Sequence, residues 1–517
     1  MADHEASSGW AAGGPQECDR RSGEGAAAAK SGSARRLART YGVKFAVISG
    51  VLLIPCYWQK HIEAGDLASH LYNAWLVQLI HQGRAPGLYL APVWNNVLFD
   101  YLLSGLAGLF GFAAAEKLAV SLAVLVFFWG AFAFAWAASR QAPWFLLPCL
   151  AMLAYGWTFH SGFFNYYLSV GLSFWGLAIF LAVDGWKRYL ALGLPPLIVL
   201  GHPMGLVWFL GAVAYIAAAE RVRGRYQILL LLPIAAALAG LHHYLLSRFT
   251  VENLASPRYL YQGADQLMLS TDRHIYVAGA AFFFGAACFL WDAVRRRREP
   301  GYFRRAGVLL QLYGAGLLAV FLLPDAVFLP SYSAPVGLIV QRLTLIPAVV
   351  GCCLLGTMAP RRWHAAGFSV IAAAFFFLTY RETRVLNHME EQAARLLENV
   401  PAETRVLETI VARPESRIYF IDHMVDRECI GHCFAYGNYE PASGQFRVRA
   451  RPENPIVMAE AGDIGDMEEG TYKVPPEVLP IFQVYQCSKD FTRLCIRKLK
   501  AGEANGRLDV HPEEDDP

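Results

Sequence analysis

The chain has 517 residues, of which 55% are hydrophobic and only 17% are charged, and its mean hydropathy is +0.32. An average soluble domain carries roughly 25% charged residues, so the composition argues against a series of soluble domains and favours a polytopic membrane protein. The formal net charge is only +3. The basic residues stand in short loops between apolar runs, a pattern that gives no support for a nucleic-acid partner.

The chain begins with an Ala-, Gly- and Ser-rich segment at residues 1–38. Such a composition buries too little apolar surface to fold, so we expect a disordered cytoplasmic tail. A basic stretch then precedes FAVISGVLLIPCYW, which no small-residue cleavage site follows, and Pro55 before Cys56 does not fit a lipoprotein motif. We therefore predict an uncleaved signal anchor with its N-terminus in the cytoplasm.

Further apolar runs have the length of membrane spans, about 20 residues each. They lie at residues 92–112, 117–137, 143–158, 164–184, 188–219, 226–246, 275–294, 305–325, 336–357 and 363–380. Together with the anchor they give about eleven spans, if 188–219 is a single span interrupted by its prolines. Two short spans there, with a non-crossing segment around TFHSGFFNYY, would preserve the same parity, and both alternatives stay open.

Arginine clusters fall in alternate loops, at residues 221–225, 295–305 and 361–362. All three can be cytoplasmic under the positive-inside rule. Residues 39–380 are thus expected to form the transmembrane domain of an inner (cell) membrane protein. The outer side then receives the loop at 59–91, the loops at 247–274 and 326–335, and everything after residue 380.

Residues 381–500 have a mixed, charged composition with a helical start and short β-like runs such as RVLETIV, RIYFID and GQFRVRA. This pattern predicts a small extracytoplasmic α+β domain. It is followed by an acidic segment, 501–517, that we expect to be disordered.

Four cysteines lie in this predicted domain. An even number of cysteines in an exported domain favours two disulfides, and three pairings remain open for Cys429, Cys433, Cys487 and Cys495. The alternative is a metal site that combines two of them with His423 and His432. Because the C-x3-C spacing is not a recognised zinc arrangement, we predict disulfides and no metal site here.

The outer loop contains HIEAGDLASHLYNAW at residues 61–75, the stretch most suited to chemistry. Helical spacing would place Glu63, Asp66 and His70 on one face. Apolar residues also recur at helical spacing, so we expect an amphipathic helix along the outer membrane surface. A partly desolvated carboxylate beside an imidazole is a candidate base or metal ligand. The alternative interpretation is a group of solvated side chains in a juxtamembrane loop.

The loop carries three further features: Gly65-Asp66 followed by His70, the turn Gly83-x-x-Pro86, and the run Pro92-Val93-Trp94-Asn95. With the predicted topology, they resemble the GT-C glycosyltransferase superfamily, which includes protein O-mannosyltransferases and lipid A aminoarabinose transferases. Many members show adjacent or once-spaced acidic pairs, whereas this chain has Glu63-x-x-Asp66. The departure leaves Asp66 as the main candidate and Glu63 as a possible substrate contact.

The resemblance implies a transferase that moves a sugar from a polyprenyl-phosphate donor to a lipid, glycan or protein acceptor on the outer side of the membrane. Such a reaction needs a base for the acceptor hydroxyl and cations for the departing phosphate. Asp66 would be this base, or would hold a divalent ion such as Mg²⁺ or Mn²⁺. His70 would orient Asp66 or bind phosphate. No resident cofactor is identified by the sequence.

Other candidate substrate contacts lie near the predicted outer ends of spans. Arg342 is an intramembrane cation, which commonly faces a cavity or an anion, although its guanidinium could instead reach the headgroups. Arg258 is a weaker candidate for the same role. Tyr259 and Tyr261 could stack on a sugar or belong to an interfacial aromatic belt.

Asn165 and His202 interrupt apolar runs beside Gly or Pro. Polar groups at such positions are expected where the backbone lines a cavity rather than lipid. Each residue is therefore a candidate substrate contact, and the alternative for each is a structural hydrogen bond within the bundle.

Two other classes of protein remain as alternatives. A multi-pass transporter commonly shows repeated halves with paired broken helices, and no internal repeat is visible here. A non-catalytic membrane scaffold would not require an Asp and a His at helical spacing in an outer loop. We therefore favour the transferase interpretation.

Overall fold

The computed structural model describes residues 41–506, except for residues 223, 300–301, 419, 459, 461 and 489. The predicted tail at 1–38 lies outside the described residues. Two compact units are present, Met1–Ile54 and Pro55–Pro517. In the first unit, the predicted signal anchor contains the apolar helix Tyr41–Leu52. The short helix α2 (Ile54–Tyr57) comes next in the chain and contains the boundary between the two units.

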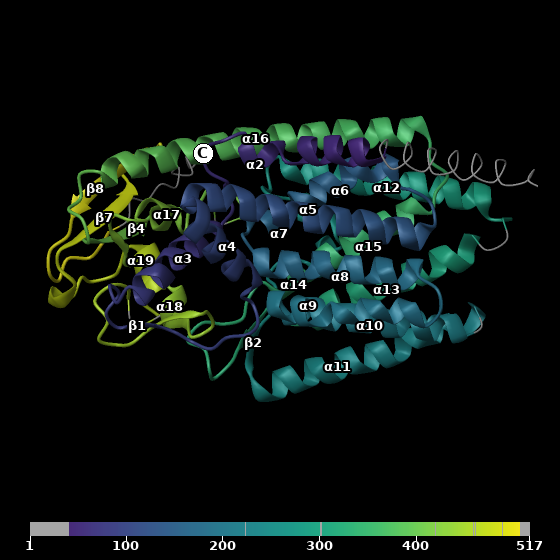
Figure 1. The fold of residues 1–517 in the computed structure, drawn as a ribbon, viewed down its shortest axis with the longest axis horizontal. Helices are drawn as coiled ribbons and strands as arrows, with labels where there is room; N and C mark the ends of the chain where they lie inside the picture. The colour runs from purple at the N-terminus through teal and green to yellow at the C-terminus, as the bar shows by residue number, and fades with distance from the viewer. Residues whose placement is uncertain are drawn as a thin grey trace, which may run out of the picture. The chain divides into compact units, whose positions relative to one another are not determined.

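The second unit contains a bundle of apolar helices that run side by side (Figure 1). In the described part of the chain, seven helices are long and apolar enough to cross a membrane. They are α5 (Phe112–Ser139), α8 (Phe164–Ala182), α10 (Pro203–Arg221), α11 with the preceding turn η3 (Tyr226–Arg248), α12 (His274–Arg296), α14 with α15 (Ile339–Gly356) and α16 (Arg362–Leu397). Shorter apolar helices are α4 (Leu98–Phe110) and most of α13 (Ala306–Leu322). The chain is therefore a polytopic helical membrane protein.

Two of the predicted spans are broken. The run at 143–158 forms only η1 (Trp144–Leu146), α6 (Leu147–Ala154) and α7 (Trp157–His160), because Gly156 is extended and lies against the Gln266 carbonyl, 2.7 Å from where a Cβ would be. The run at 188–219 divides into η2 (Gly185–Gly193), α9 (Pro195–Gly201) and α10, since prolines begin both α-helices. The prediction of one spanning helix at 143–158 is wrong.

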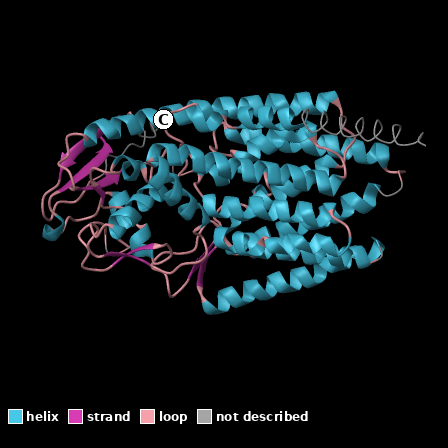
Figure 2. Ribbon diagram, viewed as in Figure 1, coloured by secondary structure: helices cyan, strands magenta, loops and turns pink. Residues whose placement is uncertain are grey.

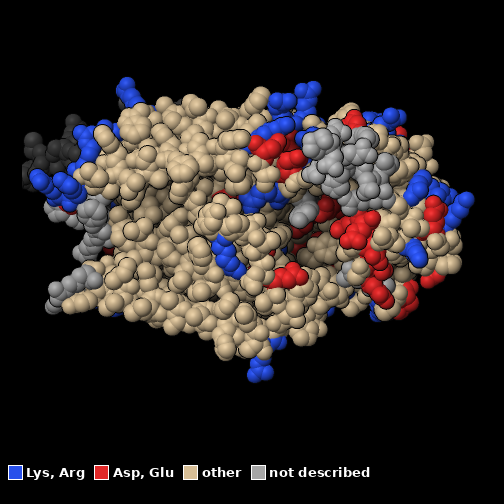
Figure 3. Space-filling view, turned by 180° about the vertical axis from the view of Figure 1, so that it is seen from behind, with Lys and Arg blue, Asp and Glu red and all other residues tan. Residues whose placement is uncertain are grey.

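The arginine-rich end of α12 and the beginning of α16 lie at the end of the bundle opposite the sheet (Figure 1). Charged side chains are sparse over the helices and gather toward the ends of the molecule, and Asp and Glu border a hollow near the region that carries the sheet (Figure 3). This distribution agrees with a membrane-embedded bundle. Which side is cytoplasmic stays a prediction.

The C-terminal region has the predicted α+β character, with its strands confined to one end of the bundle (Figure 2). Its sheet has the order β5-β4-β7-β8. The strands are β4 (Arg405–Thr409), β5 (Phe434–Ala435), β7 (Ile481–Gln486) and β8 (Leu494–Lys498). β4 is parallel to β5 and β7, and β8 is antiparallel to β7. Around them lie α17 (Met424–Glu428), α18 (Glu440–Ser443), α19 (Asp463–Glu469) and η6 (Pro476–Val478).

Two features tie this region to the bundle. α16 runs without a break from its apolar part past residue 381 and packs against β8. The segment 59–91 contributes β1 (Leu88–Leu90), which pairs with β6 (Val448–Ala450). A second pair, β2 (Thr250–Glu252) with β3 (Ala326–Phe328), joins two interhelical loops. The segment 59–91 and the C-terminal region thus pack together.

Two local expectations are corrected by the structure. RIYFID is an irregular segment rather than a strand, because Leu269 and Trp157 bind the backbone of Arg417. Residues 501–506 are packed instead of disordered, and the Asn505 amide donates to the Thr409 hydroxyl (2.7 Å). The remainder of the predicted acidic tail, 507–517, lies outside the described residues.

The helix expected on the membrane surface, α3 (Leu67–His81), is buried on most of its circumference. It packs against α4, α17 and β1. Its polar side chains have buried partners: Ser69 and Asn73 donate to the Glu440 carboxylate at 2.9 and 2.8 Å. α3 is therefore a connector between the bundle and the C-terminal region, and the prediction of an interfacial amphipathic helix is wrong.

Candidate active site

A cavity of about 370 Å³ lies where the bundle meets the C-terminal region. Five segments that are distant in sequence line it: the start of α3, the loop before α4, the turn between α7 and α8, the segment that leads into α14, and parts of 422–468. Its polar lining includes Asp66, His70, Asn165, Arg342, Asp422, His423 and Glu468. Four residues predicted from the sequence, Asp66, His70, Asn165 and Arg342, are thus brought together.

Asp66 is the N-cap residue of α3 and is positioned through its backbone. Its amide donates to the Ser161 carbonyl (3.3 Å), and the preceding Gly65 amide donates to the His160 carbonyl (2.7 Å). Gly162, with φ +80°, lies so close that a Cβ there would be 2.4 Å from the Asp66 nitrogen. The carboxylate itself is half-buried and makes no hydrogen bond or ion pair with any described residue. Asp66 therefore faces the cavity with its oxygens available.

His70 is held by a buried polar network one helical turn after Asp66. Its Nδ1 donates to Asp100 Oδ1 (2.7 Å), and the Asn165 amide donates to Asp100 Oδ2 (2.9 Å). Burial alone would lower the His70 pKa, but the Asp100 carboxylate overrides it and raises the pKa to about 9. His70 is consequently an imidazolium near neutral pH.

Asp100 was missed by the sequence analysis, although a carboxylate within an apolar run is a signal in its own right. It is joined through Asn165 to the loop before α4, because Asn165 also donates to the Asn96 carbonyl (3.0 Å) and accepts from the Phe99 amide (2.7 Å). Asn165 thus has the structural hydrogen bonds of its alternative interpretation and lines the cavity as well.

Arg342 projects into the cavity from α14 (Ile339–Leu343). Its guanidinium carbon lies 3.9 Å from the centre of the Phe163 ring, and the Tyr166 hydroxyl donates to its backbone carbonyl (2.9 Å). The buried Nε has no hydrogen-bond partner among the described residues. Leu338, which also lines the cavity and begins this helix, has φ +55°, a backbone conformation that costs energy for a branched side chain and is common at functional sites.

Asp422 and His423 enter the cavity from the segment that leads into α17. His423 is buried, stacks on Tyr439 and donates from Nδ1 to Asp426 (3.1 Å). Burial opposes its charge, but the hydrogen bond and charge of Asp426 raise the His423 pKa to about 10. Burial raises the pKa of Asp422 to about 7; the charge of His423 opposes this shift, and the charges of Glu468 and Asp66 add to it. The cavity therefore pairs acidic groups with stable cations.

The sequence did not lead us to expect Asp422 and His423 in the cavity. His423 entered the sequence analysis only in a rejected metal site, and RIYFID resembled a strand. The available signal was the dipeptide Asp422-His423 directly after an apolar run. Two carbonyls of the segment before α14 accept from the Gln445 amide at 2.7 and 3.3 Å, so the C-terminal region also shapes the Arg342 side of the cavity.

Other predicted site residues lie elsewhere. Glu63 is 4% exposed and accepts from the Asn387 amide (2.6 Å). Arg258 donates to two carbonyls at the end of α13, and Tyr261 packs against Val320 nearby. Tyr259 is 69% exposed. His202 caps α10 through its Nδ1 and contacts the ring of Tyr166, which itself lines the cavity.

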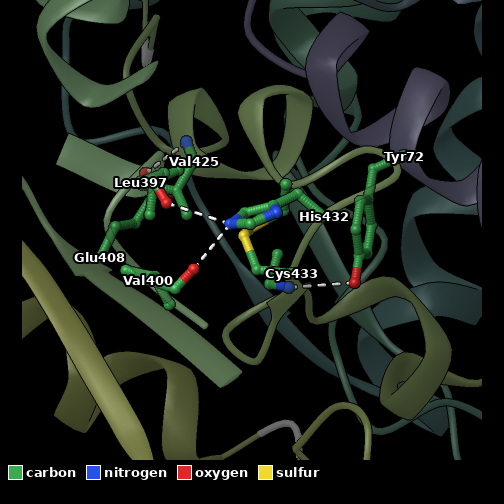
Figure 4. The surroundings of a disulfide bond; sticks show 9 residues. Tyr72, Leu397, Val400, Glu408, Val425, His432 and Cys433 are labelled. Atoms are coloured by element: carbon green, nitrogen blue, oxygen red, sulfur yellow. Dashed lines mark hydrogen bonds between the residues drawn. A yellow bond between two sulfur atoms is a disulfide. The ribbon is translucent and has the colours of Figure 1, made fainter. Parts of the chain in front are cut away.

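The disulfides connect neighbouring cysteines, Cys429 with Cys433 and Cys487 with Cys495. The first closes the chain directly after α17. Beside it, the His432 ring points at the carbonyl groups of Leu397 and Val400, 3.1 and 2.8 Å away (Figure 4). The disulfide therefore holds the turn that carries His432, and the His432 ring joins the segment after Asp422 and His423 to the end of α16. The disulfide also removes the cysteines from the alternative metal site.

Among the described residues, two groups have ligand atoms close enough to hold a metal ion: His61, Glu390, Glu428 and Glu408, His423, Asp426. The Arg427 guanidinium lies 3.0 Å from Glu390 in the first group, and in the second His423 keeps its proton through Asp426. Both groups thus already have an internal cation, and neither contains Asp66. The donor atoms of these two groups therefore fit a divalent ion poorly. Binding of Mg²⁺ or Mn²⁺ at Asp66 stays a prediction.

A long helical bundle, the segment 59–91 packed on a C-terminal α+β region, and a cavity where the bundle meets that region together form the GT-C type of fold expected from the sequence. The chain is similar to the crystal structure of ArnT from Cupriavidus metallidurans in the apo state, with 12% identity and a TM-score of 0.51, over 89% of this chain and 98% of that chain. This likeness establishes the fold.

A second similar structure is the archaeal oligosaccharyltransferase AglB from Archaeoglobus fulgidus in complex with an inhibitory peptide and a dolichol-phosphate. It has 12% identity and a TM-score of 0.36, over 86% of this chain and 69% of that chain. No protein-family model and no curated protein matches the sequence.

Proposed function

We propose that this protein is a membrane glycosyltransferase that moves a sugar from a polyprenyl-phosphate donor to an acceptor on the outer side of the membrane. The observation that carries this proposal is the cavity in which an unpartnered carboxylate, Asp66, faces the cations Arg342 and His423. The GT-C type of fold supports it, since the cavity lies at the end of the bundle, where a lipid-linked donor can reach it.

Asp66 would act as the base. In the reaction, the acceptor oxygen bonds to the anomeric carbon, the bond from that carbon to the phosphate oxygen breaks, and the hydroxyl proton passes to the Asp66 carboxylate. Because no described residue donates to this carboxylate, its lone pairs are free to accept the proton. His70, one turn later and bound to Asp100, provides a fixed positive charge beside it.

Arg342 and His423 would stabilise the departing polyprenyl phosphate. The unpartnered Nε of Arg342 is a donor without an internal acceptor, and an anion would satisfy it. Stacking on Phe163 and Tyr439 holds the two cations in place, so little reorganisation is needed when negative charge develops. Asp422, whose pKa is about 7, can donate a hydrogen bond to a sugar hydroxyl when protonated and accept one from it when ionised.

The test is Asp66→Asn, which keeps the size of the side chain and removes its basicity. Membranes that contain the variant are supplied with labelled polyprenyl-phosphate sugar, and release of the label from the lipid is followed. General bases contribute about 10² to 10⁴ in rate, so we expect a loss in that range. Asp184→Asn, an exposed aspartate outside the cavity, is the matched control and should transfer normally.

Unchanged transfer by Asp66→Asn would refute its role as the base. The transporter alternative predicts a different result: the labelled substrate would accumulate inside sealed vesicles in chemically unchanged form. The scaffold alternative predicts no change in the donor with the wild-type protein.

A further inference from the structure

A second pocket has a different set of lining residues and lies beside the beginning of α12 and the part of α16 that follows its apolar stretch. Its volume is about 180 Å³, far above the roughly 15 Å³ that one water requires. Three arginines from different parts of the chain line it: Arg273 at the N-cap of α12, Arg381 of α16, and Arg413 of the segment after β4. Three arginines in the lining of one pocket favour an anionic ligand.

The charges of the pocket are only partly compensated. Glu382 is the carboxylate among its lining residues, and Arg273 pairs with Asp272 (3.0 Å) outside it. Within the described part of the chain, Arg381 and Arg413 take part in no hydrogen bond or ion pair through their guanidinium groups. An excess of positive charge therefore remains in the lining.

The apolar lining and the surface beneath the pocket match a lipid. Met389, Ile418 and Phe420 contribute apolar walls. The rings of His274 and Phe375, 5.8 Å apart, hold the beginning of α12 against the middle of α16. Directly along these helices, Tyr276 is 77% exposed and Phe377 is 59% exposed, as expected for side chains at the membrane interface. A headgroup in the pocket would leave its acyl chains against this apolar surface.

One stretch of the chain contributes residues to both the pocket and the cavity. Ile418, Phe420 and Ile421 line the pocket, and the chain continues from Ile421 directly into Asp422 and His423. The same segment is fixed to the loop before α12, where the Arg417 amide donates to the Leu269 carbonyl (3.0 Å). A ligand that bridges Arg381 and Arg413 would join α16 to the segment that carries these two cavity residues.

We propose that this pocket binds the phosphodiester headgroup of an anionic membrane phospholipid. Each guanidinium can donate two parallel hydrogen bonds to phosphate oxygens, and juxtamembrane basic groups attract anionic lipids. The proposal does not rest on the proposed glycosyl transfer, because lipid binding is measured without a sugar donor.

The test uses the full chain released from detergent and analysed by native mass spectrometry with phosphatidylglycerol or phosphatidylcholine. We expect wild-type protein to retain phosphatidylglycerol preferentially. The double variant Arg381→Gln and Arg413→Gln should bind it at least about tenfold more weakly, as expected for lost charge-assisted hydrogen bonds. Arg395→Gln, an exposed arginine later on the same helix, is the matched control and should behave as wild type.

A further variant keeps the proposal testable if the double variant folds poorly. Glu382→Gln removes the lining carboxylate and should strengthen phosphatidylglycerol binding. Equal retention by the wild type and the double variant would overturn the proposal, as would unchanged binding by Glu382→Gln. Millimolar inorganic phosphate distinguishes the source of the ligand: if it displaces the lipid, the pocket is a site for free phosphate and not for a headgroup.

Discussion

Replacement of Gly162 by alanine should displace the proposed base, Asp66, although no ionisable residue is substituted. A Cβ at this position would be 2.4 Å from the Asp66 nitrogen and 2.9 Å from its Cα, whereas ordinary contact begins at 3.4 Å. The neighbouring atoms are backbone, so the start of α3 must move by about 1 Å. Because a 1 Å misplacement of a reacting group can cost about a hundredfold in rate, we expect transfer by Gly162→Ala to fall by about that factor.

The matched control is Gly83→Ala. Gly83 also has a positive φ, +69°, but no atom lies within 4 Å of the point that a Cβ would occupy, so only the backbone penalty of roughly 1–2 kcal/mol applies. Both variants are purified and compared by transfer rate and by thermal unfolding. If Gly162→Ala and Gly83→Ala retain equal activity, the close approach of Gly162 does not position Asp66, and this explanation of the site is refuted.

Two further predictions concern the surroundings of the cavity. Changing Cys429 and Cys433 together to serine should destabilise the protein by about 2 kcal/mol and also reduce transfer, because the segment after the cavity residues is released; the same change at the second disulfide should affect unfolding alone. Asp100→Asn should remove the charge that raises the His70 pKa from 6.5 to about 9, an ion pair worth roughly 3 kcal/mol. The resulting loss of unfolding free energy should be largest below pH 6.5 and disappear as the pH rises through about 9, where wild-type His70 loses its proton; a pH-independent loss would contradict this assignment.

The bundle could be predicted from the sequence because the length of an apolar run shows directly whether it can span a membrane. The failures occurred where tertiary contacts determine the backbone. The run at 143–158 is apolar throughout, yet Gly156 is extended against the Gln266 carbonyl. α3 shows apolar residues at helical spacing, but its polar face is covered by Glu440 from a distant part of the chain. Periodicity alone cannot identify such a partner.

The site was predictable only in part for the same reason. Asp66 and His70 were found because they lie four residues apart, and Arg342 because an intramembrane cation is costly. Asp422 and His423 approach them through folding of the C-terminal region, about 350 residues later in the sequence. Glu63, three residues before Asp66, seemed equivalent to it by spacing, but its carboxylate turns toward Asn387 and away from the cavity.

The hydrogen bonds of the buried carboxylates explain why Asp66 leads the candidates. Asp100 accepts from His70 and Asn165, Glu440 from Ser69 and Asn73, and both are committed to joining parts of the fold. Carboxylate oxygens that already accept internal hydrogen bonds are less available to a substrate proton. Asp66 has no such donor among the described residues and is fixed only through its backbone. Its position is therefore determined by the fold, while its oxygens remain available for a substrate proton.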